Sequence, residues 1–319
     1  MNILIIKHGS IGDFVMSIGA IISIRNKFPN KRINLLTTTS IKNIFFKIPY
    51  IDQIYIDDRK SYLDLYQYLI KLKKLDISIV IDLQNSKRTE IYHFFTRIFY
   101  KNIKINSSKK FAHFRYKIPP HGNEHVCDGL NNQLKLMKIN KFYKPKVDWL
   151  KNKKYKNPLK KKYVVLIPGS SKSGIEKRWS AKSYSDLSKI FFEQKFDVIA
   201  TGGDTDKDIV NEIISYNHKI IQSEYLSNFN NFINLCNESS LIISVDTGPA
   251  HIAALSDKPI IWLVYRSPYN FTNVPISKNI HIIKADKMQN ISVSDVVKLS
   301  KTILKLNLVI LIGMWVYQV

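Results

Sequence analysis

The sequence predicts an α/β protein with two domains, each built around a parallel sheet. Short buried-type strands alternate with segments of helical period, and this alternation starts again halfway along the chain. In the first half, a strand over residues 2–6 precedes a glycine-containing loop, a helix over residues 14–28 that Pro29 ends, and a strand over residues 33–37. Because strands joined through a helix lie parallel, this order predicts a βαβ unit.

Further elements continue the alternation in both halves. The first half adds strands over residues 53–56 and 77–82, a helix over 61–74, a loop over 111–122 and a helix over 124–139. The second half has strands over residues 163–167, 197–201, 241–245 and 259–264, and helices over 183–195, 206–216, 249–255 and 294–306. Two such halves predict two Rossmann-like domains that face one cleft, with ligands bound at the carboxyl ends of the strands.

The length of 319 residues allows two domains of about 150 residues, each with its own core. Residues 141–162 contain ten lysines and two prolines, which is typical of an interdomain linker. The expected domains are residues 1–150 and 151–319. Residues 306–319 are almost entirely apolar but fall short of the roughly 20 residues of a membrane span. Three interpretations of this segment are considered: a tail that packs on the core, an anchor at the membrane interface, and a terminus that lacks its normal sequence.

Composition indicates the compartment and the class of partner. Cys127 and Cys236 lie outside any CxxC pattern, and the N-terminus has no signal-peptide features, so a cytoplasmic location is expected. The net charge of +24 attracts polyanions such as nucleic acid, anionic lipid headgroups or phosphorylated glycans. The chain has no helix-turn-helix, RNP-type or zinc-finger spacing, so nucleic acid is not the expected partner.

The strongest motif is the stretch over residues 241–251, Leu-Ile-Ile-Ser-Val-Asp-Thr-Gly-Pro-Ala-His. A buried-type strand runs into Asp246 and Thr247, which we interpret as helix caps, and Gly248 allows a tight turn into a helix that contains His251. The unpaired N–H groups at such a helix start bind anions, most often phosphate. The alternative is an ordinary, well-capped βα turn.

Two other loops follow predicted strands. Residues 9–13, Gly-Ser-Ile-Gly-Asp, match neither the GxGxxG fingerprint nor a Walker A loop, and they place Asp13 at a helix start as an N-cap or as a general base. Residues 168–179 are rich in Gly and Ser and end in Lys177, Arg178 and Trp179. The two cations suit phosphate, although a solvated loop gives the same pattern, and Trp179 is expected to pack beneath the loop.

A histidine-containing stretch over residues 121–127 raises the question of a metal site. His121, Glu124, His125 and Cys127 lie close together in the sequence, but no second cluster supplies further ligands at a recognisable spacing. No metal is therefore expected.

The four motifs Gly-Ser-Ile-Gly-Asp, Pro-Gly-Ser…Glu-Lys-Arg-Trp, Thr-Gly-Gly and Ser-Val-Asp-Thr-Gly-Pro-Ala-His occur in this order. In this combination the chain resembles the bacterial lipopolysaccharide heptosyltransferases of glycosyltransferase family 9 over roughly residues 1–300. The resemblance implies a GT-B fold, a donor of the ADP-heptose type, no cofactor, and metal-independent transfer with inversion. It also implies an acidic lipid-linked glycan as acceptor and work at the inner face of the inner membrane.

The same resemblance implies roles for particular residues. Asp13 matches the general base, and Lys177 matches a lysine that contacts the donor phosphates. The donor-binding turn corresponds to Asp246, Thr247, Gly248 and His251, and Asp206 matches an acidic residue near the donor ribose. Cations for an acidic acceptor are Lys87, Arg88 and Arg115.

One departure from the family pattern concerns the loop over residues 265–269. This chain has Tyr-Arg-Ser-Pro-Tyr where the family usually has a Gly-Pro-Thr-type loop, so the donor's base and sugar stay open. A non-catalytic nucleotide-binding or polyanion-binding protein on the same scaffold is the competing hypothesis.

Overall fold

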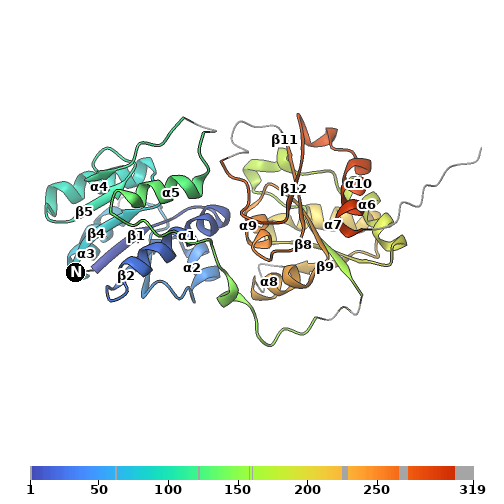
Figure 1. Cartoon of the computed structure of the whole chain (residues 1–319), viewed down its shortest axis with the longest axis horizontal. Coiled ribbons are helices and arrows are strands. Elements are labelled where there is room, and N and C mark those ends of the chain that lie inside the picture. Colours follow the sequence, from blue (N-terminus) through green and yellow to red (C-terminus); the bar gives the residue numbers. More distant parts are fainter. Residues whose placement is uncertain are drawn as a thin grey trace, which may run out of the picture.

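The computed structural model describes residues 2–305, except residues 62, 121–122, 158, 160, 225–228 and 266–271. The described residues form two lobes that lie side by side, each with a six-stranded parallel sheet (Figure 1). Residues from strand-to-helix connections of both lobes line a common cavity between the lobes.

The N-terminal sheet has the strand order β3-β2-β1-β4-β5-β6, and each neighbouring pair is parallel. This is the Rossmann order, in which the topology reverses next to the first strand. Its strands are β1 (Asn2–Ile6), β2 (Ile33–Thr37), β3 (Gln53–Ile56), β4 (Ile77–Asp82), β5 (Lys104–Ser107) and β6 (Phe114–Arg115). The helices of this lobe are α1 (Ile11–Lys27), α2 (Thr39–Phe45), α3 (Leu63–Lys74), α4 (Lys87–Phe99) and α5 (Val126–Lys135).

The C-terminal sheet has the order β12-β11-β10-β7-β8-β9, which is the same topology read from the other edge. Its strands are β7 (Tyr163–Ile167), β8 (Asp197–Gly202), β9 (Ile221–Glu224), β10 (Leu241–Val245), β11 (Ile260–Tyr265) and β12 (Ile280–Ala285). Its helices are α6 (Ala181–Glu193), α7 (Lys207–Tyr216), α8 (Phe229–Glu238), α9 (Gly248–Ala254) and α10 (Val293–Leu304). Short 3-10 helices span Asp148–Leu150, Lys172–Lys177, Asp204–Asp206 and Met288–Asn290.

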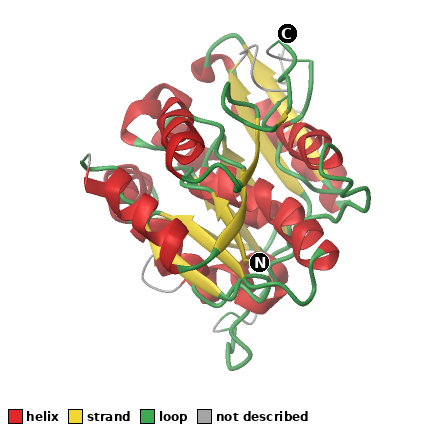
Figure 2. Cartoon of the chain, turned by 90° about the vertical axis from the view of Figure 1, so that its left-hand side faces the viewer, coloured by secondary structure: helices red, strands yellow, loops and turns green. Residues whose placement is uncertain are grey.

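Helices cover both faces of each sheet, so the central strands are buried on both sides (Figure 2). In β1, Ile3 and Ile5 face the core under α1, whereas Leu4 and Ile6 face the core under α3 and α4. This alternation follows from the two-residue period of a strand. It explains why the strand sequence is apolar at consecutive positions.

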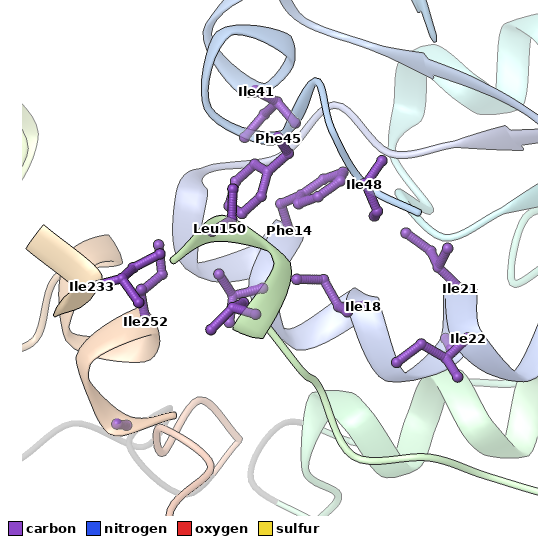
Figure 3. Packing of buried hydrophobic residues seen from close by; sticks show 14 of the residues in the cluster. Phe14, Ile18, Ile21, Ile22, Ile41, Phe45, Ile48, Leu150, Ile233 and Ile252 are labelled. Carbon is purple, nitrogen blue, oxygen red and sulfur yellow. The ribbon is translucent and has the colours of Figure 1, made fainter. Parts of the chain in front are cut away.

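The two lobes share one hydrophobic core at their junction. The tilted rings of Phe14 in α1 and Phe45 in α2 pack with their centroids 4.6 Å apart, and the Phe45 ring also packs against Phe229 of the C-terminal lobe at 6.5 Å. Ile233 and Ile252 approach this group from α8 and α9 (Figure 3). The lobes are therefore held together by apolar packing as well as by the connecting segment.

The structure corrects several sequence-based predictions. The first helix begins at Ile11 and not at residue 14, and Val126–Lys135 is shorter than the predicted helix over 124–139. The predicted loop over 111–122 contains the short strand Phe114–Arg115, which pairs with β5. A two-residue strand has no periodicity to detect.

The remaining expectations concern the linker and the C-terminal tail. The predicted linker contains the 3-10 helix Asp148–Leu150, and its side chains Val147 and Leu150 are buried in the shared core. Residues 306–319 lie outside the described residues. Within the described part of the chain, no helix is both long enough and apolar enough to cross a membrane.

Candidate active site

Two cavities open at the carboxyl ends of the strands. The interlobe cavity, of about 330 Å³, lies between the lobes, and the N-lobe cavity, of about 370 Å³, lies mainly in the N-terminal lobe. Asp13 and Asn273 line both. The interlobe cavity brings together all seven residues predicted for catalysis and donor binding, namely Asp13, Lys177, Asp206, Asp246, Thr247, Gly248 and His251.

The N-terminal ends of α1 and α9 are in contact at the interlobe cavity, because each helix has a glycine at the point of contact. A Cβ atom on Gly12 would lie 2.7 Å from Cδ2 of His251, and a Cβ on Gly248 would lie 3.1 Å from Cβ of Ile11. Larger residues at either position would push the helices apart. Both helix N-termini, with their partial positive charges, therefore face the same cavity.

Asp13 is the third residue of α1 and is held by a capping box. Its backbone N–H donates to Oγ of Ser10, and its Oδ2 accepts from the backbone N–H of Ser10, both at 3.3 Å. Ser10 is thus the N-cap, a position that the sequence analysis had offered to Asp13. The capping box fixes the Asp13 carboxylate at the boundary of the two cavities.

Lys177 and Asp246 form an ion pair across the interlobe cavity, with Nζ donating to Oδ2 at 2.8 Å. Burial acts to lower the pKa of Lys177, but the hydrogen bond to Asp246 and its charge outweigh burial and raise the pKa. Lys177 is therefore a fixed cation at neutral pH, with part of its side chain exposed to the cavity.

The helix that follows β10 begins at Gly248, one residue before the predicted start at Pro249, and its capping also differs from the prediction. Thr247 is the N-cap of α9, yet its side chain makes no capping hydrogen bond. Pro249 has no N–H to donate, and the N–H of Ala250 donates to the backbone oxygen of Thr247 at 3.1 Å. Since Asp246 is paired with Lys177, neither predicted capping side chain caps the helix.

His251 projects from α9 and is almost completely buried against the start of α1. Burial lowers its pKa to about 4, although the charges of Asp246 and Asp13 act in the opposite direction. The imidazole is therefore neutral at physiological pH and offers its ring N–H as a hydrogen-bond donor.

Asp206 lines the interlobe cavity, but its carboxylate is engaged by the protein. Its Oδ2 accepts from the N–H of Gly203 at 3.1 Å, and Oδ1 lies 3.6 Å from Arg178. The Arg178 guanidinium also pairs with Asp208 at 2.7 Å and donates to Oγ of Ser170. Arg178 thus ties the loops after β7 and β8 together instead of facing the cavity as a free cation.

Lys7 is a basic residue of the N-lobe cavity that was not predicted from the sequence. Its side chain is buried, and Nζ donates to the backbone oxygen of Leu83 at 3.2 Å. Burial lowers its pKa, while the charges of Asp13 and Asp82 act to raise it. A single lysine after a strand has no spacing signal, so only the structure identifies it.

The three cations predicted for the acceptor lie elsewhere. Lys87, Arg88 and Arg115 are absent from the described lining of both cavities. Arg88 donates to Asp64 at 3.0 Å and lies 3.4 Å from Asp57. Its charge is therefore largely compensated within the N-terminal lobe.

Among the residues that the structure describes, no group of three or more His, Cys, Asp or Glu side chains is arranged so that it could hold a metal ion. His121 lies outside the described residues. His125 is instead the N-cap of α5, accepting from the N–H of Cys127, with Nε2 placed 2.9 Å from the backbone oxygen of Val274. As predicted, Trp179 is buried, and its Nε1 donates to the backbone oxygen of Ile291 at 2.9 Å.

Two parallel Rossmann-type sheets that face a polar cavity define the GT-B class of glycosyltransferase folds. The chain belongs to glycosyltransferase family 9 (heptosyltransferase), whose sequence profile matches residues 71–302. It is therefore a glycosyltransferase.

Individual relatives agree with this assignment. The chain is 21% identical over 280 residues to the lipopolysaccharide core heptosyltransferase OpsX of Haemophilus influenzae, covering 84% of this chain and 80% of OpsX. Its fold is similar to that of E. coli ADP-heptose LPS heptosyltransferase II, with a TM-score of 0.75, 15% identity, and coverage of 96% of this chain and 99% of that one. E. coli heptosyltransferase WaaC, solved with ADP, gives a TM-score of 0.71, 13% identity, and coverage of 95% and 100%.

Proposed function

We propose that this protein is an inverting, metal-independent heptosyltransferase. It moves a heptose, or a related sugar, from an ADP-sugar to an acceptor of the lipopolysaccharide core. The position of Asp13 carries the proposal, because this carboxylate lines both cavities. We assign the interlobe cavity to the donor and the N-lobe cavity to the acceptor, with residues 1–150 as the acceptor-side domain and residues 151–319 as the donor domain. A structure of E. coli heptosyltransferase WaaC has been solved with ADP-2-deoxy-2-fluoro heptose, and this complex supports the choice of donor.

In the proposed reaction, Asp13 accepts the proton of the acceptor hydroxyl while that oxygen attacks the anomeric carbon. The bond from this carbon to the diphosphate oxygen breaks, and ADP leaves with the electron pair. Negative charge therefore grows on the diphosphate, where Lys177 and the N-terminal amides of α1 and α9 stabilise it. Neutral His251 donates a hydrogen bond in the same cavity without competing for the proton.

An acidic acceptor suits the N-lobe cavity because Lys7 lies there beside Asp13. A Cβ atom on Gly9 would lie 2.8 Å from Cβ of Asp13 and 3.3 Å from Cε of Lys7, so both side chains flank this glycine. In this assignment Lys7 binds the acid group of the acceptor and Asp13 its reacting hydroxyl. The contribution of the other predicted cations, Lys87, Arg88 and Arg115, is limited to the electrostatic potential around the cavity.

The location proposed for the enzyme is the cytoplasm, at the inner face of the inner membrane. A lipid-linked core acceptor is presented at that surface, and the net charge of +24 favours an anionic one.

The test is transfer from ADP-heptose to a core acceptor by wild type, Asp13→Asn and Asp295→Asn. Asp295 is the matched control, because it is also the third residue of a Ser-capped helix, α10, and lies outside the described lining of both cavities. Loss of the base is expected to reduce kcat by about 10²- to 10⁴-fold in Asp13→Asn, while Asp295→Asn retains the wild-type rate.

Each part of this proposal has its own readout. A wild-type rate in Asp13→Asn would remove Asp13 from the base role. Inversion is read from the anomeric configuration of the product, and metal independence from an unchanged rate in EDTA. Thermal stabilisation by ADP-heptose without any transfer would favour the non-catalytic alternative.

A further inference from the structure

Helix α4 presents its apolar side chains to solvent and its polar side chains to the protein interior. The buried residues of this helix are Thr89, Tyr92, His93 and Thr96. Its outer row holds large apolar side chains, of which Ile91 is 48% exposed, Phe94 39%, Ile98 48% and Phe99 61%. A surface helix of a soluble protein normally has the opposite arrangement.

Polar contacts fix this orientation of α4. The Tyr92 hydroxyl donates to Asp57 at 2.8 Å, and the hydroxyls of Thr96 and Tyr68 lie 2.9 Å apart. His93 lies 3.4 Å from the carboxylate of Asp82. Rotating α4 to bury its apolar row would break these contacts and leave polar groups without partners, so the outward apolar row is a stable feature.

The neighbouring helix α3 extends the same apolar surface. It packs beside α4 through stacked Tyr68 and Tyr92 rings, with centroids 4.6 Å apart. Its outward residues Leu63, Tyr66 and Ile70 are 68%, 63% and 44% exposed. We call the joint surface the α3–α4 face, which comprises Leu63, Tyr66, Ile70, Ile91, Phe94, Ile98 and Phe99. It lies on the side of the N-terminal lobe away from the C-terminal lobe (Figure 1).

The two helices that form the α3–α4 face carry an excess of basic residues. The two helices contain six basic residues (Lys71, Lys73, Lys74, Lys87, Arg88 and Arg97) against two acidic ones (Asp64 and Glu90). Asp64 is paired with Arg88, which leaves an excess of cations on these helices. Exposed apolar and aromatic side chains together with basic residues are the composition of a surface that binds anionic bilayers.

We propose that the α3–α4 face docks the enzyme on an anionic lipid bilayer, with its aromatic and aliphatic side chains inserted at headgroup depth. The turn that enters α4, Leu83 to Asn85, lines the N-lobe cavity, and the exposed Ile118 also lines it. Because this turn leads into α4, the start of the α3–α4 face lies next to the cavity that the proposed function assigns to the acceptor. This last consequence rests on the proposed function, whereas docking itself does not.

The test compares vesicle binding of the full chain with that of a triple variant, Ile91→Gln, Phe94→Gln and Ile98→Gln. The three residues are solvent-exposed, so folding is retained and is checked by circular dichroism. The matched control replaces exposed apolar residues of the C-terminal lobe, Tyr216→Gln and Ile282→Gln, which are 52% and 46% exposed. Binding is measured by co-sedimentation, without sugar donor, on phosphatidylglycerol–phosphatidylcholine vesicles and on phosphatidylcholine vesicles.

Wild type and control are expected to bind the anionic vesicles, and the triple variant to bind at least about tenfold more weakly because it no longer inserts apolar side chains. A Phe94→Trp variant should shift its fluorescence to the blue on these vesicles, and a Tyr216→Trp variant should not. Equal binding by wild type and triple variant would overturn the proposal. It would also be overturned if wild type formed a dimer that the triple variant does not form in light scattering, because the face would then be a subunit interface.

An activity measurement separates this inference from the proposed function. With a lipid-free acceptor, the triple variant should transfer sugar at the wild-type rate, whereas with the acceptor embedded in anionic vesicles it should be slower. Vesicle binding without transfer to any acceptor would leave the docking surface intact and reject the proposed function.

Discussion

Asp57 is a buried carboxylate beneath α4 that accepts a hydrogen bond from the Tyr92 hydroxyl. Burial acts to raise the pKa of Asp57, but hydrogen bonds from His8 and Tyr92 and the charge of Arg88 outweigh burial and hold the pKa at about 2. The His8 ring nitrogen lies 2.9 Å from Oδ2 of Asp57. These contacts connect the loop after β1, the loop after β3, and α4, so a single charge holds three segments of the N-terminal lobe together.

The depressed pKa makes stability dependent on pH. Because the folded pKa is below the unfolded value of 3.8, the contribution of Asp57 is complete above about pH 4 and is lost as the pH falls toward 2. The difference corresponds to about 2 kcal/mol. Asp57→Asn should therefore lower the free energy of unfolding by about that amount at pH 7, as measured in urea. Asp186→Asn, which removes an exposed i,i+3 pair with Lys189, should change it by less than about 0.5 kcal/mol. Equal losses in the two variants would contradict this account.

At the scale of elements, α1 and α9 form the closest contact between the lobes at the site. Gly12 allows the imidazole of His251 to lie against the first turn of α1, and this burial keeps His251 neutral. Two glycines and one histidine thus determine both the spacing of the helices and the protonation state of a residue in the cavity.

A double-mutant cycle tests this contact. Gly12→Ala improves helix propensity by about 1 kcal/mol, but the new methyl group would overlap His251, so a net loss of roughly 1–3 kcal/mol is expected in urea unfolding. In a His251→Ala background the overlap is removed, and Gly12→Ala should be neutral or stabilising. A loss of the same size in both backgrounds would show that the helices are not in contact there.

Buried strands were predicted more accurately from the sequence than the surface helix α4. The strands β1, β2, β4 and β7 were predicted to the residue, because apolar runs between turn residues mark buried parallel strands. The edge strand β3, which is only partly buried, was also predicted to the residue. Helix α4 was missed, since its apolar row faces solvent and its inner row is polar. Seven residues that line the interlobe cavity were predicted from motifs, whereas Lys7 and the pairing of Arg178 depend on contacts between segments far apart in the chain.

For the whole molecule, the decisive feature is the core that the lobes share. Phe45 is fully buried and meets Phe14 on α1, Trp149 in the connecting segment and Phe229 on α8. It therefore joins both lobes and the segment between them. The junction resembles the interior of a domain more than a hinge.

Phe45→Ala should lower the free energy of unfolding by about 3–5 kcal/mol, because it opens a cavity where both lobes pack. Phe46→Ala is a matched control at the next position, where the ring is 57% exposed. Its effect should stay within about 0.5 kcal/mol. Urea unfolding measures both, and similar values for the two variants would mean that the junction contributes little to stability.

The shared core also limits how this enzyme can be recombined with its relatives. Cutting the chain between the lobes would expose Phe14, Phe45 and Ile252 to water, so neither half is expected to behave well as a separate product. A chimera that exchanges one lobe to alter acceptor choice must also transplant the matching surface of α1, α2, α8 and α9. A lobe can therefore be exchanged between relatives only together with the residues that it contributes to the shared core.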